Sequence, residues 1–180
     1  MMEKYLVRQA KLSDLPIIMD IESQSFNLVT QESIDVYRER ITHFADGFYI
    51  FLYQKQVIGF LTSEIWSSLP TKDNNHLAIN HSIADVFNRQ GTVLYISSFE
   101  LNPKFRGRGL GTYFFDYFLS DIKNKFHQLE KAVLIVNENW VQAINIYHKQ
   151  NFKLAFDLKN FFIEENKCPS TGLVLVKTFN

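Results

Sequence analysis

The stretch that decides the fold lies in the middle of the chain and reads Asn102-Pro103-Lys104-Phe105-Arg106-Gly107-Arg108-Gly109-Leu110-Gly111-Thr112. It follows a β-rich run, Thr92 to Leu101, and precedes an apolar segment with helical spacing, Tyr113 to Phe126. Free backbone N–H groups at the start of a helix attract anions, and glycines let a ligand approach the main chain closely. The stretch therefore predicts a turn that binds pyrophosphate.

The spacing of the three glycines separates this turn from two other phosphate-binding motifs. No Gly-Lys-Ser/Thr ending supports a P-loop, and the glycines do not have the spacing of the dinucleotide fingerprint. A plainer interpretation is a tight strand-to-helix connection with surface arginines. Three alternating glycines and two arginines directly after a strand favour the anion site over that interpretation.

The composition limits the classes of protein to consider. The 180 residues include 19 basic and 19 acidic side chains, so no net charge attracts the chain to nucleic acid or a membrane surface. The single cysteine, Cys168, excludes an intramolecular disulfide. Met1 to Ala10 lacks the pattern of a secretion signal, and no run reaches the ~18 apolar residues of a membrane span. We expect a cytoplasmic protein.

The order of elements predicts an α/β fold with a mixed sheet and helices on both faces. Strand-like runs are Tyr5–Arg8, Phe48–Tyr53, Val57–Trp66, Thr92–Leu101, Ala132–Val136, Phe152–Phe156 and Leu173–Phe179. Helical segments are expected from Ser13 to Ser25, from near Thr30 to Gly47, around Ile79 to Phe87, from Tyr113 to Phe126 and from Trp140 to Lys149. No linker or repeat interrupts them, which indicates a single domain over residues 3–179.

Two segments carry a resemblance to a known family. The turn, preceded by Phe99-Glu100-Leu101-Asn102-Pro103, resembles the acetyl-CoA motif of GNAT acetyltransferases, in which Asn/Asp-Pro precedes Arg/Gln-x-x-Gly-x-Gly/Ala. Ala143 to Phe152 is similar to the family's Ala-Ile-x-Leu-Tyr-x-x-x-Gly-Phe segment, with Asn151 in place of the glycine. Asparagine tolerates the left-handed conformation expected at a helix C-terminus, so the replacement is mild.

The resemblance implies a fold and a cofactor. It predicts a mostly antiparallel sheet of about seven strands, with the strands Thr92–Leu101 and Ala132–Val136 splayed apart to form a slot. In that slot acetyl-CoA would lie with its pantetheine arm along the main chain of Phe99 and Leu101. The residues expected to bind acetyl-CoA are Phe99, Glu100, Leu101, Arg106, Gly107, Arg108, Gly109, Leu110, Gly111, Thr112 and Asn139. The family asparagine falls on Trp140 here, and whether Asn139 or Trp140 takes its role stays open.

The resemblance also implies acetyl transfer to a primary amine by direct attack in a ternary complex. Tyr147 matches the family tyrosine near the thioester sulfur, and a phenol can give a proton to the departing thiolate. Glu100 is the candidate base, being the only charged residue of its strand. Alternatives are Glu64 or a water positioned by Tyr95 and Ser97, which by alternation share a face with Phe99.

The histidines are expected to be surface residues rather than metal ligands, because their spacing is not that of ligands on one helix face. They are His43, His76, His81, His127 and His148. No metal is predicted.

The acceptor is the open question. The layout is most similar to the arylalkylamine and polyamine branch, in which a segment corresponding to Ser67–Gln90 walls the amine pocket. That branch's histidine pair falls on about Tyr95 and Ser97. A polyamine would need the fold to collect acidic residues from Glu22, Glu32, Asp35, Glu64, Asp73 and Asp85.

A small-molecule amine is the predicted acceptor, with an aminoglycoside among the possibilities. A peptide or protein N-terminus, and an acetyl-CoA sensor without turnover, remain the alternatives. The Phe-rich terminal strands would suit a homodimer.

Overall fold

Seven strands of the described residues form one sheet with the order β1-β2-β3-β4-β5-β7-β6. The computed structural model describes residues 5–26, 28–73, 75–163 and 167–179, so residues 3 and 4 of the predicted domain and Asn74 of the predicted loop lie outside it. The strands are β1 (Tyr5–Gln9), β2 (Phe48–Tyr53), β3 (Gln56–Trp66), β4 (Val93–Leu101), β5 (Lys131–Asn137), β6 (Lys153–Phe162) and β7 (Ser170–Thr178). Only the pairing of β4 with β5 is parallel within this sheet, which confirms the predicted mixed, mostly antiparallel architecture.

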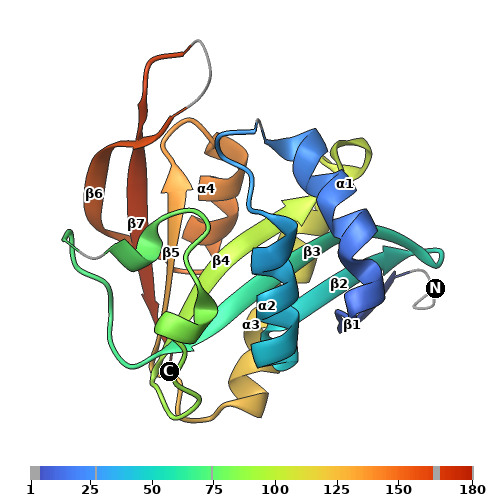
Figure 1. The fold of residues 1–180 in the computed structure, drawn as a ribbon, viewed down its shortest axis with the longest axis horizontal. Coiled ribbons are helices and arrows are strands. Elements are labelled where there is room, and N and C mark those ends of the chain that lie inside the picture. Colours follow the sequence, from blue (N-terminus) through green and yellow to red (C-terminus); the bar gives the residue numbers. More distant parts are fainter. Residues whose placement is uncertain (1–4, 27, 74, 164–166, 180) are drawn as a thin grey trace.

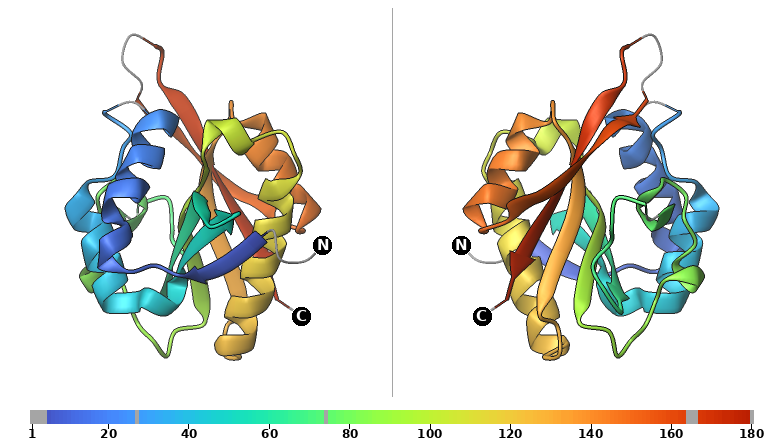
Figure 2. Two further views of the ribbon diagram at one scale, coloured as in Figure 1. Left: turned by 90° about the vertical axis from the view of Figure 1, so that its right-hand side faces the viewer. Right: turned by 90° about the vertical axis from the view of Figure 1, so that its left-hand side faces the viewer.

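Helices cover both faces of the sheet, as predicted (Figures 1 and 2). The two on one face are α1 (Leu15–Ser25) and α2 (Ile34–Phe44), and the two on the other are α3 (Leu110–Lys125) and α4 (Val141–Lys149). The second helix begins later than predicted because the side chain of Ser33 caps it, accepting a hydrogen bond from the Val36 backbone at 3.3 Å. The third begins earlier than predicted, with Gly109 at its N-cap, so the glycine-rich turn runs directly into the helix.

The prediction of a helix around Ile79 to Phe87 was wrong. The segment contains only short 3₁₀ turns, at Asn75–Leu77 and Ile83–Asp85. Its polar groups bond to other elements instead of to a local helix: the side chain of Asn80 accepts from the Ser33 backbone at 2.7 Å, and the backbone N–H of Asn88 donates to the Ile65 carbonyl at 2.8 Å. Apolar residues at helical spacing here face the sheet and α2 without forming regular structure.

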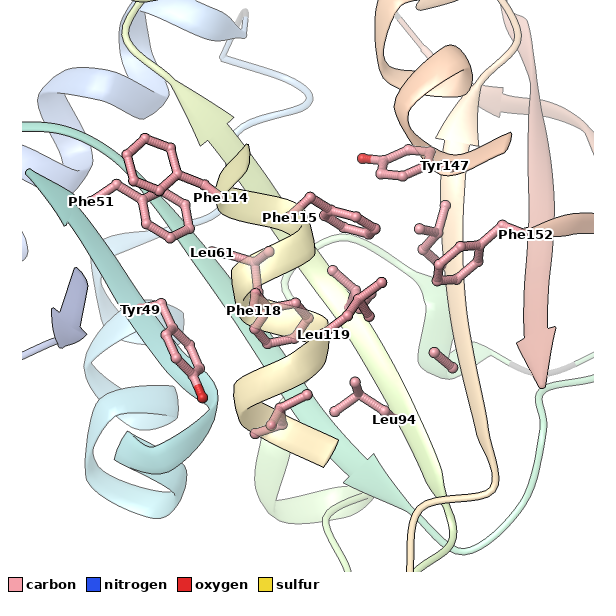
Figure 3. Packing of buried hydrophobic residues seen from close by; sticks show 14 of the residues in the cluster. Tyr49, Phe51, Leu61, Leu94, Phe114, Phe115, Phe118, Leu119, Tyr147 and Phe152 are labelled. Atoms are coloured by element: carbon pink, nitrogen blue, oxygen red, sulfur yellow. The ribbon is translucent and has the colours of Figure 1, made fainter. Parts of the chain in front are cut away.

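Aromatic side chains fill the core between the sheet and α3. Phe51 and Phe114 stack with ring centroids 4.3 Å apart, and the Phe115 ring lies 5.1 Å from that of Tyr147 (Figure 3). The Phe115 ring also lies 5.4 Å from that of Phe99. Most of the high phenylalanine content is therefore used in packing. The same packing places Tyr147 of α4 against the α3 face of the sheet.

Strands β4 and β5 pair over only the first part of their length and then diverge. Their pairing runs from Val93 opposite Lys131 to Ile96 opposite Leu134, while β4 continues to Leu101 and β5 to Asn137. The predicted splay is thus confirmed. It begins at a β-bulge, because β3 pairs with Ile96 and then with Ser98, which leaves Ser97 as an extra residue of β4.

The bulge reverses the alternation of side chains along β4. Tyr95 stacks on Trp66 at 4.3 Å on one face of the sheet, whereas Phe99 packs with Phe115 on the face that α3 covers. The expectation that Tyr95 and Ser97 share a face with Phe99 was therefore wrong. An extra residue shifts the period of two by one, so Glu100 turns toward α1 instead.

At the C-terminus of α4, Asn151 occupies the position where the family has a glycine. Asn151 has φ 64°, the left-handed conformation that was expected there. Asn151→Ala should lower the free energy of unfolding by about 1 kcal/mol, because an alanine side chain clashes in this conformation. Asn151→Gly should not destabilise the protein, and equilibrium urea unfolding of both variants provides the measurement. Equal losses in the two variants would contradict the explanation from φ.

Candidate functional site

A cavity of about 760 Å³ opens where β4 and β5 diverge. Ten of the twelve residues predicted for cofactor binding and catalysis line it: Phe99, Glu100, Leu101, Arg106, Gly107, Gly109, Gly111, Thr112, Asn139 and Tyr147. The other two do not. Arg108 is exposed, with its guanidinium carbon 5.7 Å from the centroid of the Phe105 ring, and Leu110 is buried in the core.

The glycine-rich turn has the conformation that an anion site requires. Gly107 and Gly109 have φ of 72° and 77°, and a Cβ on either would meet no atom within 4 Å, so backbone conformation rather than crowding calls for glycine. A Cβ on Gly111 would lie 2.8 Å from Cδ1 of Ile146 in α4, so the Ile146 side chain would have to shift. The first N–H groups of α3 have no partner within the helix and line this part of the cavity.

The Arg106 side chain is engaged within the protein. Its Nε donates to the Leu101 carbonyl at 2.8 Å and its Nη2 to the Ser25 hydroxyl at 2.7 Å. The guanidinium thus ties the end of β4 to the end of α1.

Tyr147 lies on the cavity side of α4 and is 7% exposed. Its ring packs between Phe115 and Phe152, and in Figure 3 its hydroxyl oxygen points toward the side on which β4 runs. Burial raises the pKa of this phenol above its usual value of 10. The group is therefore protonated at neutral pH and can donate a proton.

The start of α4 departs from the family pattern as the sequence indicated. Trp140 is the N-cap residue, and its side chain makes no capping hydrogen bond. Asn137 shapes the turn, since its side-chain oxygen accepts from the Asn139 backbone at 2.9 Å. The Trp140 ring lies 5.2 Å from that of Phe26 and 5.1 Å from that of Phe162. These three side chains, which we call the aromatic row, all line the cavity.

Glu100 and Glu22 form a buried pair of carboxyl groups, 4% and 1% exposed, in the wall of the cavity. Glu22 accepts hydrogen bonds from the Tyr37 hydroxyl at 2.6 Å and from the Glu32 backbone at 2.7 Å. Neither oxygen of Glu100 has a donor in the protein. Burial, and then the neighbouring carboxyl group of Glu22, raise the pKa of Glu100 well above its usual range. We call these two residues the carboxyl pair.

A second buried cluster, the ion network, consists of Glu32, Arg40, Glu64 and His81. Arg40 contacts Glu32 at 3.0 Å and Glu64 at 3.2 Å, and His81 Nε2 lies 2.9 Å from the Glu64 carboxylate. The other ring nitrogen, Nδ1, lies 3.0 Å from the Ala78 carbonyl, so both nitrogens face acceptors, which favours the imidazolium form. Burial alone would lower the pKa of His81, but the hydrogen bond and charge of Glu64 outweigh it and raise the pKa.

Sequence reasoning missed the role of His81. The expectation of a surface residue was wrong, because its side chain is only 8% exposed. No local signal marks it: its partner Glu64 lies 17 residues away, across a loop without regular structure. The network also occupies Glu64, one of the alternative bases, which takes hydrogen bonds from Trp66 and His81 and does not line the cavity.

The fold collects some of the acidic residues considered for a polyamine site. Glu22 and Glu32 line the cavity, whereas Asp35, Asp73 and Asp85 are exposed. Across residues 5–26, 28–73, 75–163 and 167–179, no three His, Cys, Asp or Glu side chains gather to hold a metal ion. No helix in that part of the chain is long and apolar enough to cross a membrane.

A splayed strand pair, a glycine-rich turn at a helix N-terminus and a buried tyrosine across the slot define a protein built to hold an extended anionic ligand. The model of the acetyltransferase (GNAT) family matches residues 15–152. The chain belongs to the acetyltransferase (GNAT) family, whose members use acyl-CoA. It is a GNAT acetyltransferase.

Solved structures of low sequence identity share the fold. The loading GNATL domain of CurA from Lyngbya majuscula superposes with a TM-score of 0.80 at 14% identity over 97% of each chain. Ard1 from Thermoplasma volcanium gives 0.74 at 18% identity over 97% of each chain. Arabidopsis thaliana Naa50, in complex with the bisubstrate analogue CoA-Ac-MVNAL, gives 0.72 at 17% identity over 98% of this chain and 99% of the other. No curated protein sequence matches significantly.

The turn generates a prediction for cofactor affinity. Gly109→Val should weaken CoA binding by about tenfold or more, since the loss of about 1.4 kcal/mol of phosphate contacts has that effect. The β-branched side chain is strained at φ 77° and projects into the open space beside the main chain. Equilibrium titration with CoA gives the affinity. Asn151→Ala, with comparable strain outside the cavity, serves as the control and should bind CoA normally.

The imidazolium of His81 generates a prediction for pH. A raised pKa in the folded state gives stability that is fully present below the unfolded pKa of about 6.5 and is lost as pH rises through the folded pKa. The stability advantage over His81→Gln should therefore shrink as the pH rises above about 6.5. The charged or titratable groups facing the ring are Glu64, Arg40 and Tyr95. Urea unfolding across this range tests the idea, and an advantage that grows with pH would contradict it.

Proposed function

We propose that this protein transfers the acetyl group of acetyl-CoA to a primary amine of a small molecule, by direct attack while both substrates are bound. One observation carries the proposal: Glu100, a buried carboxyl without a donor, and Tyr147, a buried phenol, line the same cavity at the point where β4 and β5 part. A base and an acid on two walls of one slot are what amine acylation requires.

The residues around the slot fit acetyl-CoA. The first turn of α3 and the conformations of Gly107 and Gly109 suit a diphosphate. Residues 97–101 of β4 have no strand partner on the β5 side, so their main chain can pair with an amide-bearing arm as a further strand would. Bound acetyl-CoA supplies an activated acetyl thioester. A backbone N–H near Leu101 is the proposed donor to the carbonyl oxygen.

The proton balance assigns one role to each group. An ammonium that binds beside the carboxyl pair favours its ionised form, and the proton that Glu100 shared with Glu22 leaves to solvent. Ionised Glu100 then takes a proton from the ammonium, which frees the amine for attack. As the C–N bond forms and the C–S bond breaks, Tyr147 gives its proton to the CoA thiolate. The second amine proton restores the phenol.

Two alternatives are less well supported. A sensor that binds acetyl-CoA without turnover has no use for a carboxyl held buried without a donor, which costs stability. A peptide N-terminal acetyltransferase would need an open path for the peptide chain, and the aromatic row gives this cavity an apolar lining that suits a smaller apolar amine. Some neighbours of similar fold, including Naa50, carry a peptide-like analogue, so the second alternative belongs in the test.

Release of free thiol from acetyl-CoA, followed with a panel of amines, peptides and aminoglycosides, tests the proposal. A primary amine of low molecular weight should give acceptor-dependent release. The absence of release with every acceptor, while CoA still binds, would contradict the enzyme assignment and favour the sensor.

Two variants test the assigned groups. Tyr147→Phe should lower kcat by about 100-fold with CoA affinity kept, because only the proton donor is lost. Glu100→Gln should lower kcat by a similar factor. In the unmodified protein kcat/KM should fall as pH drops through the raised pKa of Glu100, and the glutamine variant should lack that limb. Unchanged turnover in either variant removes that residue from the mechanism.

A further inference from the structure

Ion pairs bind the carboxylates of Glu32 and Glu64 beside the cavity, whereas no ion pair among the described residues joins the carboxyl pair to a cation, although the charge of Arg106 acts on Glu100. In the ion network, the two carboxylates of Glu32 and Glu64 are offset by the two cations Arg40 and His81. The carboxylate of Glu32 is further occupied by the Asn80 backbone at 2.7 Å. The network therefore has no charge left to offer a ligand, although Glu32 reaches the cavity.

The carboxyl pair offers the cavity a place for a cation. Glu22 and Glu100 are both buried in the cavity wall, and neither oxygen of Glu100 has a hydrogen-bond partner among the described residues. An ammonium placed beside them would supply the donors that Glu100 lacks. Arg106, the nearest cation, is engaged with Ser25 and Leu101 toward the turn. The pair thus forms a single cation site inside the protein.

The aromatic row forms the apolar part of the same cavity. Phe26 comes from the end of α1, Trp140 from the start of α4 and Phe162 from the end of β6, and their rings make a continuous contact. Ile79 and Phe161 extend the apolar lining. Trp140 stands where the family places an asparagine, so this apolar lining is a feature of this chain rather than of the fold.

We propose that the acceptor is a monoamine with an apolar body, its ammonium held by Glu22 and Glu100 and its body packed against the aromatic row. This inference rests on the proposed function and names its substrate class. A diamine of similar length would place its second ammonium against rings, far from any free carboxylate, at the cost of desolvation.

A matched pair of amines makes the test sharp. Hexylamine and 1,6-diaminohexane have the same carbon chain and differ in the second ammonium, and 2-phenylethylamine and a tripeptide with a free N-terminus complete the panel. With saturating acetyl-CoA, kcat/KM should be about 100-fold higher for hexylamine than for the diamine, corresponding to about 2.7 kcal/mol. 2-Phenylethylamine should be accepted as well. Equal or better use of the diamine, or preference for the peptide, overturns the inference.

Two variants separate the roles of the pair and the row. Glu22→Gln should raise KM for hexylamine by about tenfold or more, as expected for losing a charged partner of an ammonium, with CoA affinity unchanged. Asp35→Asn, which changes an exposed carboxylate on α2, is the matched control and should leave KM as it was.

Trp140→Ala should raise KM for both apolar amines and narrow the preference over the diamine. An unaltered preference in Trp140→Ala would refute the role of the row.

Calorimetry distinguishes failure of this inference from failure of the proposed function. The CoA-bound protein, which cannot acetylate, should bind hexylamine more tightly than 1,6-diaminohexane. Selective binding without turnover by any amine would overturn the enzyme assignment and support the ligand class. Turnover that favours the diamine or the peptide would support the enzyme assignment and overturn the proposed ligand class.

Discussion

The end of the β4–β5 pairing after Ile96 and Leu134 is the constraint on which the site depends. Beyond this point two neighbouring strands of one sheet no longer satisfy each other's backbone groups, and buried backbone groups must find partners. The bulge at Ser97 bends β4 away and leaves its last residues without a strand on one side. That edge and the cavity beside it form the site at which we propose that acetyl-CoA binds.

The same bulge decides which side chains of β4 face the cavity. Regular alternation would have left Glu100 on the other face of the sheet from Tyr95, and the extra residue brings it to the side of α1 and Glu22 instead. Two carboxyl groups so close cannot both ionise easily in a protein interior. Elsewhere the interior balances its charges, as Arg40 and His81 do for Glu32 and Glu64. The carboxyl pair has no cation bound to it in an ion pair, in contrast to the ion network, and this agrees with the proposal that a ligand cation binds there.

Aromatic residues serve two purposes in this chain. Phe51, Phe114 and Phe115 pack the core between the sheet and α3, where stacked and edge-on rings fill space without polar atoms. Phe26 and Trp140 make the same kind of contact at the cavity, where it shapes a ligand site. Composition alone cannot separate these two uses, because they differ in what each ring contacts: other core side chains in one case and the cavity in the other.

Local sequence patterns were enough to predict the seven strands, the four long helices, the turn from Arg106 to Thr112 and the left-handed Asn151, because each depends on neighbours within a few residues. Only the tertiary structure decided the direction of Glu100, the pairing of Glu100 with Glu22, the engagement of Arg106 with Ser25 across 81 residues, and the burial of His81. A one-residue bulge leaves no mark on composition or periodicity, yet it reverses every side chain beyond it. Contacts between distant segments follow from how the whole sheet packs, so no local pattern could have shown them.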